Sequence, residues 1–339
     1  MSLERAAVWR EAAALPDALQ ETLDATGDID ELAAALGGRG VRRIVATGNG
    51  ASWYAALGLW LASLRAPGTG APDVLALPGG LLASGDVAWR EGDLLLAFSS
   101  SGEFRDVIEA VEHEGTPGPF ALVTANPDST LGRRAGALLR VSVRSQDAVT
   151  HTQGYCGAAV AALAAWARVT ADRELERAVA GAPELAARAL AAAPGWAEAA
   201  VAGLERPTAA VAFGPGPAWA AALEAALLLG EIAIVPAQGT EVREGATTAM
   251  YPLGPGQLAL SLPGGAARLT DEAEGVCAKR GATVLRVPIE PGDDPRLAVL
   301  SGFPAPLAVS VLLAQRDGLD PDVPAWHADY LATARREEQ

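Results

Sequence analysis

The sequence contains a single lysine, Lys279, although 26 of its 339 residues are lysine or arginine. An enzyme that forms a Schiff base needs a desolvated lysine amine as its nucleophile. Lys279 lies in Cys-Ala-Lys-Arg-Gly, at the end of a predicted amphipathic helix. A solvated cation is common there because it stabilises the carboxyl end of the helix. The sequence therefore argues against Schiff-base chemistry.

Cysteines, aromatic residues and basic residues are also scarce. The two cysteines, Cys156 and Cys277, cannot form a disulfide framework or a metal cluster, so we expect a reducing, cytoplasmic compartment with no metal and no cofactor. The amino terminus carries charges where a signal peptide would be apolar, and the apolar stretches are interrupted, so no membrane span is expected. The net charge of −15 argues against nucleic acid and anionic membrane as partners.

One stretch, Leu94–Ala110, has the pattern of a buried strand, a small polar turn and a helix. The turn is Ser99-Ser100-Ser101-Gly102, and acids stand in the first turns of the helix that follows. Free N–H groups at a helix start, the helix dipole and serine hydroxyls can together hold a phosphate without a lysine. Alternatively, the serines only cap the helix.

The remaining sequence alternates predicted strands with predicted helices, which is typical of a doubly wound parallel sheet. The segments Gly48–Leu57 and Gly214–Leu223 share glycines, a tryptophan, an alanine and a leucine 166 positions apart, and Leu94–Ser101 is echoed by Leu258–Gly265, 164 positions later. The near-constant offset indicates an internal duplication. We therefore predict an α/β fold of two tandem αβα sandwiches with flavodoxin-like parallel sheets. The predicted parts are a helical arm (1–35), a first domain (36–171), a connecting helix (172–203) and a second domain with a C-terminal tail (204–339).

Two motifs carry a resemblance to a known family. Ser99–Glu103 is similar to an S-x-S-G-E phosphate loop, and Ala222–Ile232 is similar to an A-L-E-G-A-L-K-L-K-E-I helix. Weaker similarities lie in Gly50–Ser52, Val149–Thr152 and Pro321–Pro324. Over nearly its whole length the chain resembles the double SIS (sugar isomerase) domain proteins. These include the isomerase half of glucosamine-6-phosphate synthase, related sugar-phosphate isomerases and fructosamine-phosphate deglycases.

The resemblance implies a set of phosphate-binding residues. In the family, two threonines contribute to phosphate binding. One lies two places after the loop glycine, where this chain has Phe104, and the other lies in the first loop, where this chain has Ala51. The site is therefore weaker, or shaped for a different anion. The implied residues are Ser99, Ser100, Ser101 and Gly102, with Gly50, Ser52 and Thr152 as helpers.

The resemblance further implies a proton-shuttling glutamate at Glu231, which could move a proton between sugar carbons through an enediol. On the residues alone, Glu231 could instead simply end a buried helix. Glu244 stands where the family has its ring-opening histidine, and Asp329 stands where it has the C-terminal lysine. His151 and His327 are candidates to replace the missing histidine.

Three functions remain open. The first is a phosphosugar isomerase, the second a deglycase that uses the same base, and the third a sugar-phosphate-binding sensor without chemistry. The partner expected in each case is a small sugar phosphate or a related anion. The resemblance also implies a homodimer in which one subunit completes the site of the other.

Overall fold

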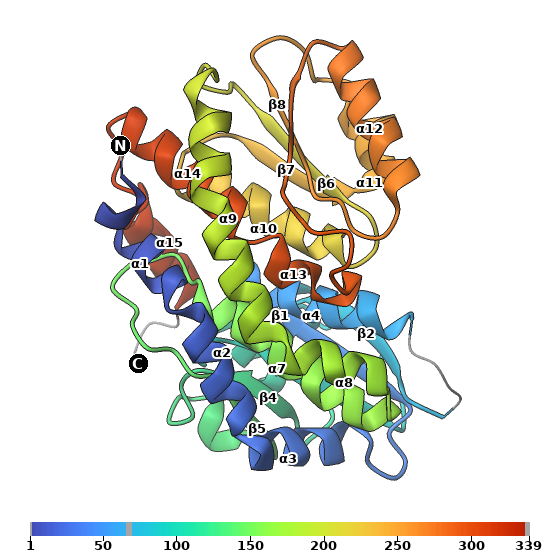
Figure 1. Ribbon diagram of the computed structural model, residues 1–339. Coiled ribbons are helices and arrows are strands. Elements are labelled where there is room, and N and C mark those ends of the chain that lie inside the picture. The colour runs from blue at the N-terminus through green and yellow to red at the C-terminus, as the bar shows by residue number, and fades with distance from the viewer. Residues whose placement is uncertain (1, 66–69, 336–339) are drawn as a thin grey trace. The chain divides into compact units, whose positions relative to one another are not determined.

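Parallel β-sheets form the centres of two structural units in the computed structural model, which describes residues 2–65 and 70–335 (Figure 1). The first-sheet unit comprises residues 17–144, 153–181 and 326–335. The second-sheet unit comprises residues 2–16, 145–152 and 182–325. The predicted domains followed the order of the chain, whereas these units exchange segments at both termini and in the middle.

The first-sheet unit has five parallel strands in the order β2-β1-β3-β4-β5. Helices α3, α4 and α7 pack on one face, and α5 and α6 pack on the other. The apolar strand interiors account for this arrangement, because a parallel sheet is covered by helices on both faces. The strands are β1 (Arg43–Gly48), β2 (Asp73–Pro78), β3 (Asp93–Phe98), β4 (Ala121–Thr124) and β5 (Ala137–Arg140). The helices are α2 (Leu15–Asp24), α3 (Thr26–Leu36), α4 (Ala51–Ser63), α5 (Gly79–Ala83), α6 (Arg105–Glu112), α7 (Gln153–Thr170), α8 (Arg173–Ala180) and α15 (His327–Ala334).

Strand β5 ends at Arg140, and the N–H of Val141 still donates to the carbonyl of Thr124 at 2.8 Å. Beyond it, side chains replace the strand pairing. The N–H of Ser142 donates to the hydroxyl of Thr22 at 2.9 Å, and the N–H of Arg144 donates to the side chain of Gln153 at 2.7 Å. These bonds satisfy the backbone outside a sheet.

The second-sheet unit has four parallel strands in the order β7-β6-β8-β9. Helix α10 packs against β6, β7, α13 and α14, and α12 covers the opposite face together with the segment after β7. The strands are β6 (Ala210–Gly214), β7 (Ala237–Glu241), β8 (Leu258–Ser261) and β9 (Thr283–Arg286). The helices are α1 (Ala7–Ala13), α9 (Ala182–Ala202), α10 (Ala218–Glu231), α11 (Val242–Glu244), α12 (Ala267–Lys279), α13 (Ala298–Ser301) and α14 (Pro304–Arg316).

The two sheets confirm the predicted duplication. Strands β1 to β4 and β6 to β9 have the same relative order, and both units place a helix directly after the first strand. Gly50 precedes one of these helices with φ of +52°, and Gly216 precedes the other with φ of +54°. A left-handed backbone at both positions explains why glycine recurs there.

The stretch Pro295–Arg316 is long and apolar enough to cross a membrane by length and composition alone. Its most apolar window is entirely buried. Helix α14 packs against α9 and α10 within the second-sheet unit, so this stretch is a core element of that unit.

Candidate functional site

The serine turn begins where β3 ends, and internal hydrogen bonds hold its shape. The hydroxyl of Ser99 accepts from the N–H of Gly102 at 3.1 Å, and the hydroxyl of Ser101 accepts from the N–H of Glu103 at 3.2 Å. Gly102 has φ of +67°, and a Cβ there would lie 1.9 Å from the hydroxyl oxygen of Ser129. The turn therefore needs glycine for both its backbone angle and its packing.

The carbonyl groups of the turn are paired, whereas two of its N–H groups are not. The carbonyl of Ser100 accepts from Ala125 at 3.1 Å, and the carbonyl of Gly102 accepts from Leu131 at 3.2 Å. The N–H groups of Ser100 and Ser101 have no acceptor within the described part of the chain. Both residues are partly exposed. Successive free N–H groups in a turn form an anion-binding concavity, which we call the anion cradle (Ser99–Gly102).

The donors of the anion cradle differ from those predicted. The sequence predicted that the N–H groups of the following helix would point at the anion. In the structure α6 begins only at Arg105, with Phe104 as its N-cap residue. The turn itself therefore offers the nearest free donors, because Gly102 and Glu103 separate Ser101 from the cap of the helix.

The loop after β1 lies at the same edge of the sheet as the anion cradle. Strands β1 and β3 are neighbours, and the chain turns to opposite sides of the sheet after them. Ligands of open parallel sheets bind at such a switch point. Asn49 joins the loop to α6 by donating to Asp106 at 2.7 Å. Gly50 and Ser52, the predicted helpers, belong to this loop and to the start of α4.

The equivalent place in the second-sheet unit offers fewer donors. Pro263-Gly264-Gly265 follows β8 in place of the serines. A Cβ on Gly264 would lie 2.9 Å from the Cβ of Ala218, so this turn packs tightly onto the start of α10. The hydroxyl-rich turn therefore occurs in one copy of the repeat.

Two glutamates lie on α10, of which Glu224 is buried and Glu231 is partly buried. Glu224 and Glu231 are separated by seven residues, which places them on one face of the helix two turns apart. Glu224 is 2% exposed, and its Oε2 atom has no hydrogen-bond partner among the residues that the structure describes. Burial, and then the charge of Glu231, raise the pKa of Glu224 well above its usual value. Burial also raises the pKa of Glu231.

The side chain of Thr150 influences the pKa of Glu231. Its hydroxyl opposes the effect of burial and lowers the pKa of Glu231. The contact is weak, because the Thr150 hydroxyl forms no hydrogen bond of standard geometry with any described residue. Thr152 is also buried, and it lies in the second-sheet unit with Glu231, whereas the anion cradle lies in the first-sheet unit. His151, between the two threonines, is exposed.

Glu11 and Asp322 hold the segment that carries these threonines. The buried carboxylate of Glu11 accepts from the N–H groups of Asp147 and Ala148, the latter at 2.8 Å. The carbonyl of Asp322 accepts from the N–H of Val149 at 2.9 Å. The position of Thr150 therefore depends on residues near both ends of the chain.

Within one chain the structure does not bring Glu244 to Glu231. Helix α10 returns the chain from the carboxyl edge of the second sheet to its amino edge, and Glu231 is the last residue of α10. Glu244 ends α11, which begins directly after β7 at the carboxyl edge. The two carboxylates therefore lie toward opposite edges of the sheet.

His327 lies in the same unit as the anion cradle. It begins α15, and its ring stacks on Tyr330 with centroids 6.2 Å apart. Tyr330 in turn contacts the ring of Phe104, with centroids 6.4 Å apart. Phe104 follows the anion cradle by two residues, so the tail packs beside the loop that the serines begin.

Comparison with known proteins identifies the fold. No family model and no curated protein matches the sequence. A candidate phosphosugar isomerase from Clostridium difficile 630 is 15% identical, with a TM-score of 0.81 over 100% of both chains. A candidate phosphosugar isomerase from Silicibacter pomeroyi DSS-3 is 23% identical, with a TM-score of 0.73 over 93% of this chain and 99% of the other. The C-terminal domain of glucosamine-fructose-6-phosphate aminotransferase from Francisella tularensis is 16% identical, with a TM-score of 0.76 over 93% of this chain and 96% of the other.

The chain has the double SIS fold. The predicted two tandem αβα units are therefore confirmed. At these identities the similarity establishes the fold, and the roles of individual residues in the double SIS fold stay predictions.

Glu224, Thr150 and Tyr330 were not predicted as site residues. One signal for Glu224 was present, since it and Glu231 are the only acids in the otherwise apolar helix α10. No local signal marks Tyr330, because its contact with Phe104 joins residues far apart in the sequence.

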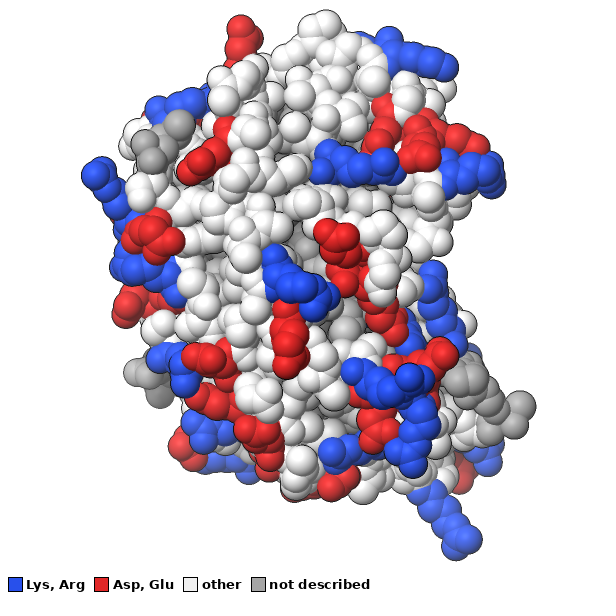
Figure 2. Space-filling view, in the orientation of Figure 1, with Lys and Arg blue, Asp and Glu red and all other residues white. Residues whose placement is uncertain are grey.

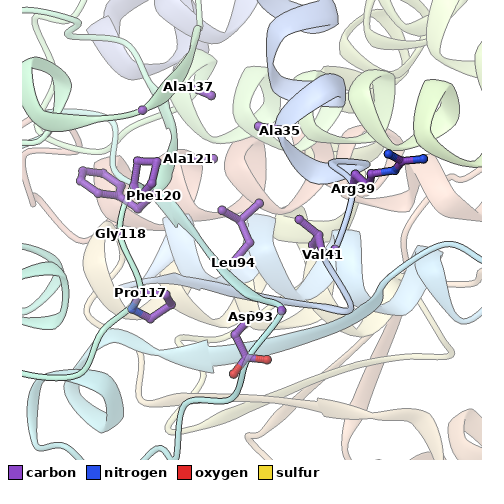
Figure 3. A pocket seen from close by; sticks show the side chains of 14 residues that line it. Ala35, Arg39, Val41, Asp93, Leu94, Pro117, Gly118, Phe120, Ala121 and Ala137 are labelled. Carbon is purple, nitrogen blue, oxygen red and sulfur yellow. The ribbon is translucent and has the colours of Figure 1, made fainter.

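A recess of about 360 Å³ lies at the amino edge of the first sheet, on the edge opposite the anion cradle. Figure 3 shows Leu94, Phe120 and Ala121 around it, with Arg39 at one side and its guanidinium directed away from them. No polar side chains converge there in this view. The recess is therefore separate from the anion cradle.

Charged side chains of both signs are mixed on the face shown in Figure 2. The described ion pairs include Arg144 with Asp17 and Glu21. No extended area of positive charge appears on this face, so an anionic ligand would depend on local donors such as those of the anion cradle. Among the residues in 2–65 and 70–335, no group of three or more metal-ligating side chains comes together.

Proposed function

We propose that this protein is an isomerase that moves a proton between C1 and C2 of a sugar phosphate. The observation that carries the proposal is the pair Glu224 and Glu231 on one face of α10, the first buried and the second partly buried, whose pKa values are both raised. Proton transfer at carbon needs a base whose pKa lies near the working pH. Burial moves a carboxyl group toward that range.

The two carboxyl groups would take different roles. Glu224 is the more deeply buried and would stay protonated, because ionising both groups on one face of α10 is unfavourable. Glu231 would then be the base. It would take the proton from one carbon of the sugar and return it to the neighbouring carbon, with an enediol between the two steps.

The anion cradle would hold the phosphate of the substrate. The free N–H groups of Ser100 and Ser101 and the serine hydroxyls would donate to the phosphate oxygens. Gly50 and Ser52 would approach from the loop after β1. The phosphosugar names of the matched structures support this choice of ligand.

Ring opening needs a further proton donor or acceptor, and His327, His151 and Glu244 are the proposed candidates. Since Glu244 and Glu231 lie toward opposite edges of one sheet, a second copy of the chain would supply Glu244 in a homodimer. The only lysine, Lys279, is exposed at the end of α12. The proposal therefore includes no Schiff base and no transfer of ammonia.

The test follows solvent exchange of the C1 and C2 protons by NMR in D₂O, with a panel of aldose, ketose and fructosamine phosphates. Glu231→Gln should lower turnover by about 10²–10⁴-fold, the usual contribution of a general base, and should leave binding unchanged. Glu198→Gln, an exposed glutamate on α9, is the control and should keep wild-type turnover. Wild-type turnover in Glu231→Gln would refute the role of Glu231. Binding without exchange or product in the wild type would instead favour a sensor.

A further inference from the structure

Phe104, two residues after the anion cradle, docks the C-terminal segment. Phe104 forms an antiparallel backbone bridge with Arg335. Its ring contacts Tyr330, and Phe104 also packs against the core cluster that includes Val107 and Leu131. Three separate contacts therefore connect the cradle loop, the core and the segment 327–335.

The bridge places a cation next to the anion cradle. Facing residues in an antiparallel pair have Cα atoms about 4.5–5.5 Å apart. Phe104 lies three residues beyond Ser101, a span of at most about 10 Å. Arg335 is exposed and has no ion-pair partner among the described residues. The Cα of Arg335 therefore lies within about 16 Å of Ser101, and its long, exposed side chain extends from that point.

Arg335 is a positive charge in a strongly acidic chain. The chain has a net charge of −15, which disfavours an anionic ligand at long range. The anion cradle itself contains no basic side chain. A guanidinium binds phosphate through two parallel hydrogen bonds and keeps its charge at any physiological pH.

We infer that Arg335 is a second anchor for the phosphate held by the anion cradle, and that Phe104 is the positioning residue that brings Arg335 there. The inference rests on the proposed function only in taking a phosphate monoester as the ligand. Phe104 offers no side-chain donor to the anion, and its pairing with the tail supplies a guanidinium in place of that donor.

The test measures binding of inorganic phosphate, of a hexose 6-phosphate and of the unphosphorylated hexose by calorimetry. Arg335→Gln should weaken both phosphate ligands by about 10- to 100-fold, the range of one charge-assisted hydrogen bond. It should also reduce the salt dependence of binding. Arg39→Gln is the matched control, because Arg39 is an exposed arginine of the same unit at the opposite edge of the sheet. It should bind like the wild type.

Phe104→Ala tests the positioning role. If Phe104 acts through Arg335, its loss should weaken phosphate binding to a similar extent, and the double variant Phe104→Ala/Arg335→Gln should bind no more weakly than either single variant. Fully additive losses would overturn the role of Phe104. Wild-type phosphate affinity in Arg335→Gln, or no phosphate binding by the wild type, would overturn the role of Arg335.

These outcomes are separate from those of the proposed function. Phosphate binding that depends on Arg335 without any proton exchange would support the inference and refute the isomerase. Sugar-phosphate turnover by Arg335→Gln with unchanged affinity would support the isomerase and refute the inference.

Discussion

Gly102→Ala tests whether the shape of the anion cradle depends on a close contact with the neighbouring turn. The variant places a methyl group 1.9 Å from the hydroxyl oxygen of Ser129. That hydroxyl donates to the carbonyl of Asn126 at 2.7 Å and accepts from the N–H of Gly132 at 3.0 Å. The turn that contains Ser129 must move to make room, and both hydrogen bonds are then disturbed.

The magnitude follows from two contributions. A non-glycine residue with φ near +67° costs about 1–2 kcal/mol. Each disturbed hydrogen bond adds about 1 kcal/mol. The free energy of unfolding should therefore fall by about 3–4 kcal/mol, and the melting temperature by roughly 6–16 °C. Phosphate binding should be lost as well, because the N–H groups of the cradle change direction.

Gly115→Ala separates the two contributions in a thermal-shift experiment with and without phosphate. Gly115 has φ of +91°, and a Cβ there would meet nothing within 4 Å. This variant should lose only the backbone contribution of about 1–2 kcal/mol and should still bind phosphate. Equal losses of stability in both variants, or intact phosphate binding in Gly102→Ala, would refute the argument from the Ser129 contact.

Three further variants test the buried acids and a helix cap. Burial raises the pKa of Glu224, so the folded chain binds that proton more tightly than the unfolded chain, and stability from this group falls as the pH rises above about 4.5. Glu224→Gln should therefore match the wild type near pH 4 and be more stable at pH 8, by about 1.4 kcal/mol for every tenfold by which folding tightens proton binding. Parallel profiles of melting temperature against pH for the two proteins would contradict this. Glu11→Ala removes the acceptor of two N–H groups, so it should lower the free energy of unfolding by about 2 kcal/mol or more. It should also lower kcat, because Glu11 holds the segment that carries Thr150. A wild-type kcat would show that turnover does not depend on this segment. Asp172→Ala removes the cap that accepts from two N–H groups of α8, both at 3.0 Å; chemical denaturation should show a loss of about 1 kcal/mol, with unchanged phosphate affinity.

Local patterns in the sequence predicted much of the fold. Short apolar runs such as 94–98 bounded by small residues indicated buried parallel strands, because strand period and turn chemistry are local properties. Gly50 and Gly216 share a left-handed backbone that few other residues adopt, so their recurrence exposed the duplication. The structure shows that the four strands of the second sheet repeat the order of four strands in the first.

The contacts that complete the candidate site could not be predicted in this way. The bridge between Phe104 and Arg335 joins residues more than 200 positions apart, and no periodicity encodes such a pair. The burial of Glu224 depends on which neighbours cover its face of α10. The start of α6 at Arg105, beyond the hydrogen-bonded serine turn, could not be located from the local pattern either.

The exchange of segments between the two units affects how the chain can be divided. The chain passes from one unit to the other after Pro16, Arg144, Thr152, Gly181 and Ala325. No single cut therefore yields a fragment that contains one complete unit and nothing else. A fragment ending at residue 181 would lack α15, which docks on Phe104, and a fragment beginning at residue 182 would lack Glu11, which holds the segment bearing Thr150. The internal repeat therefore does not coincide with the division into units, because each unit is assembled from separate segments of the chain.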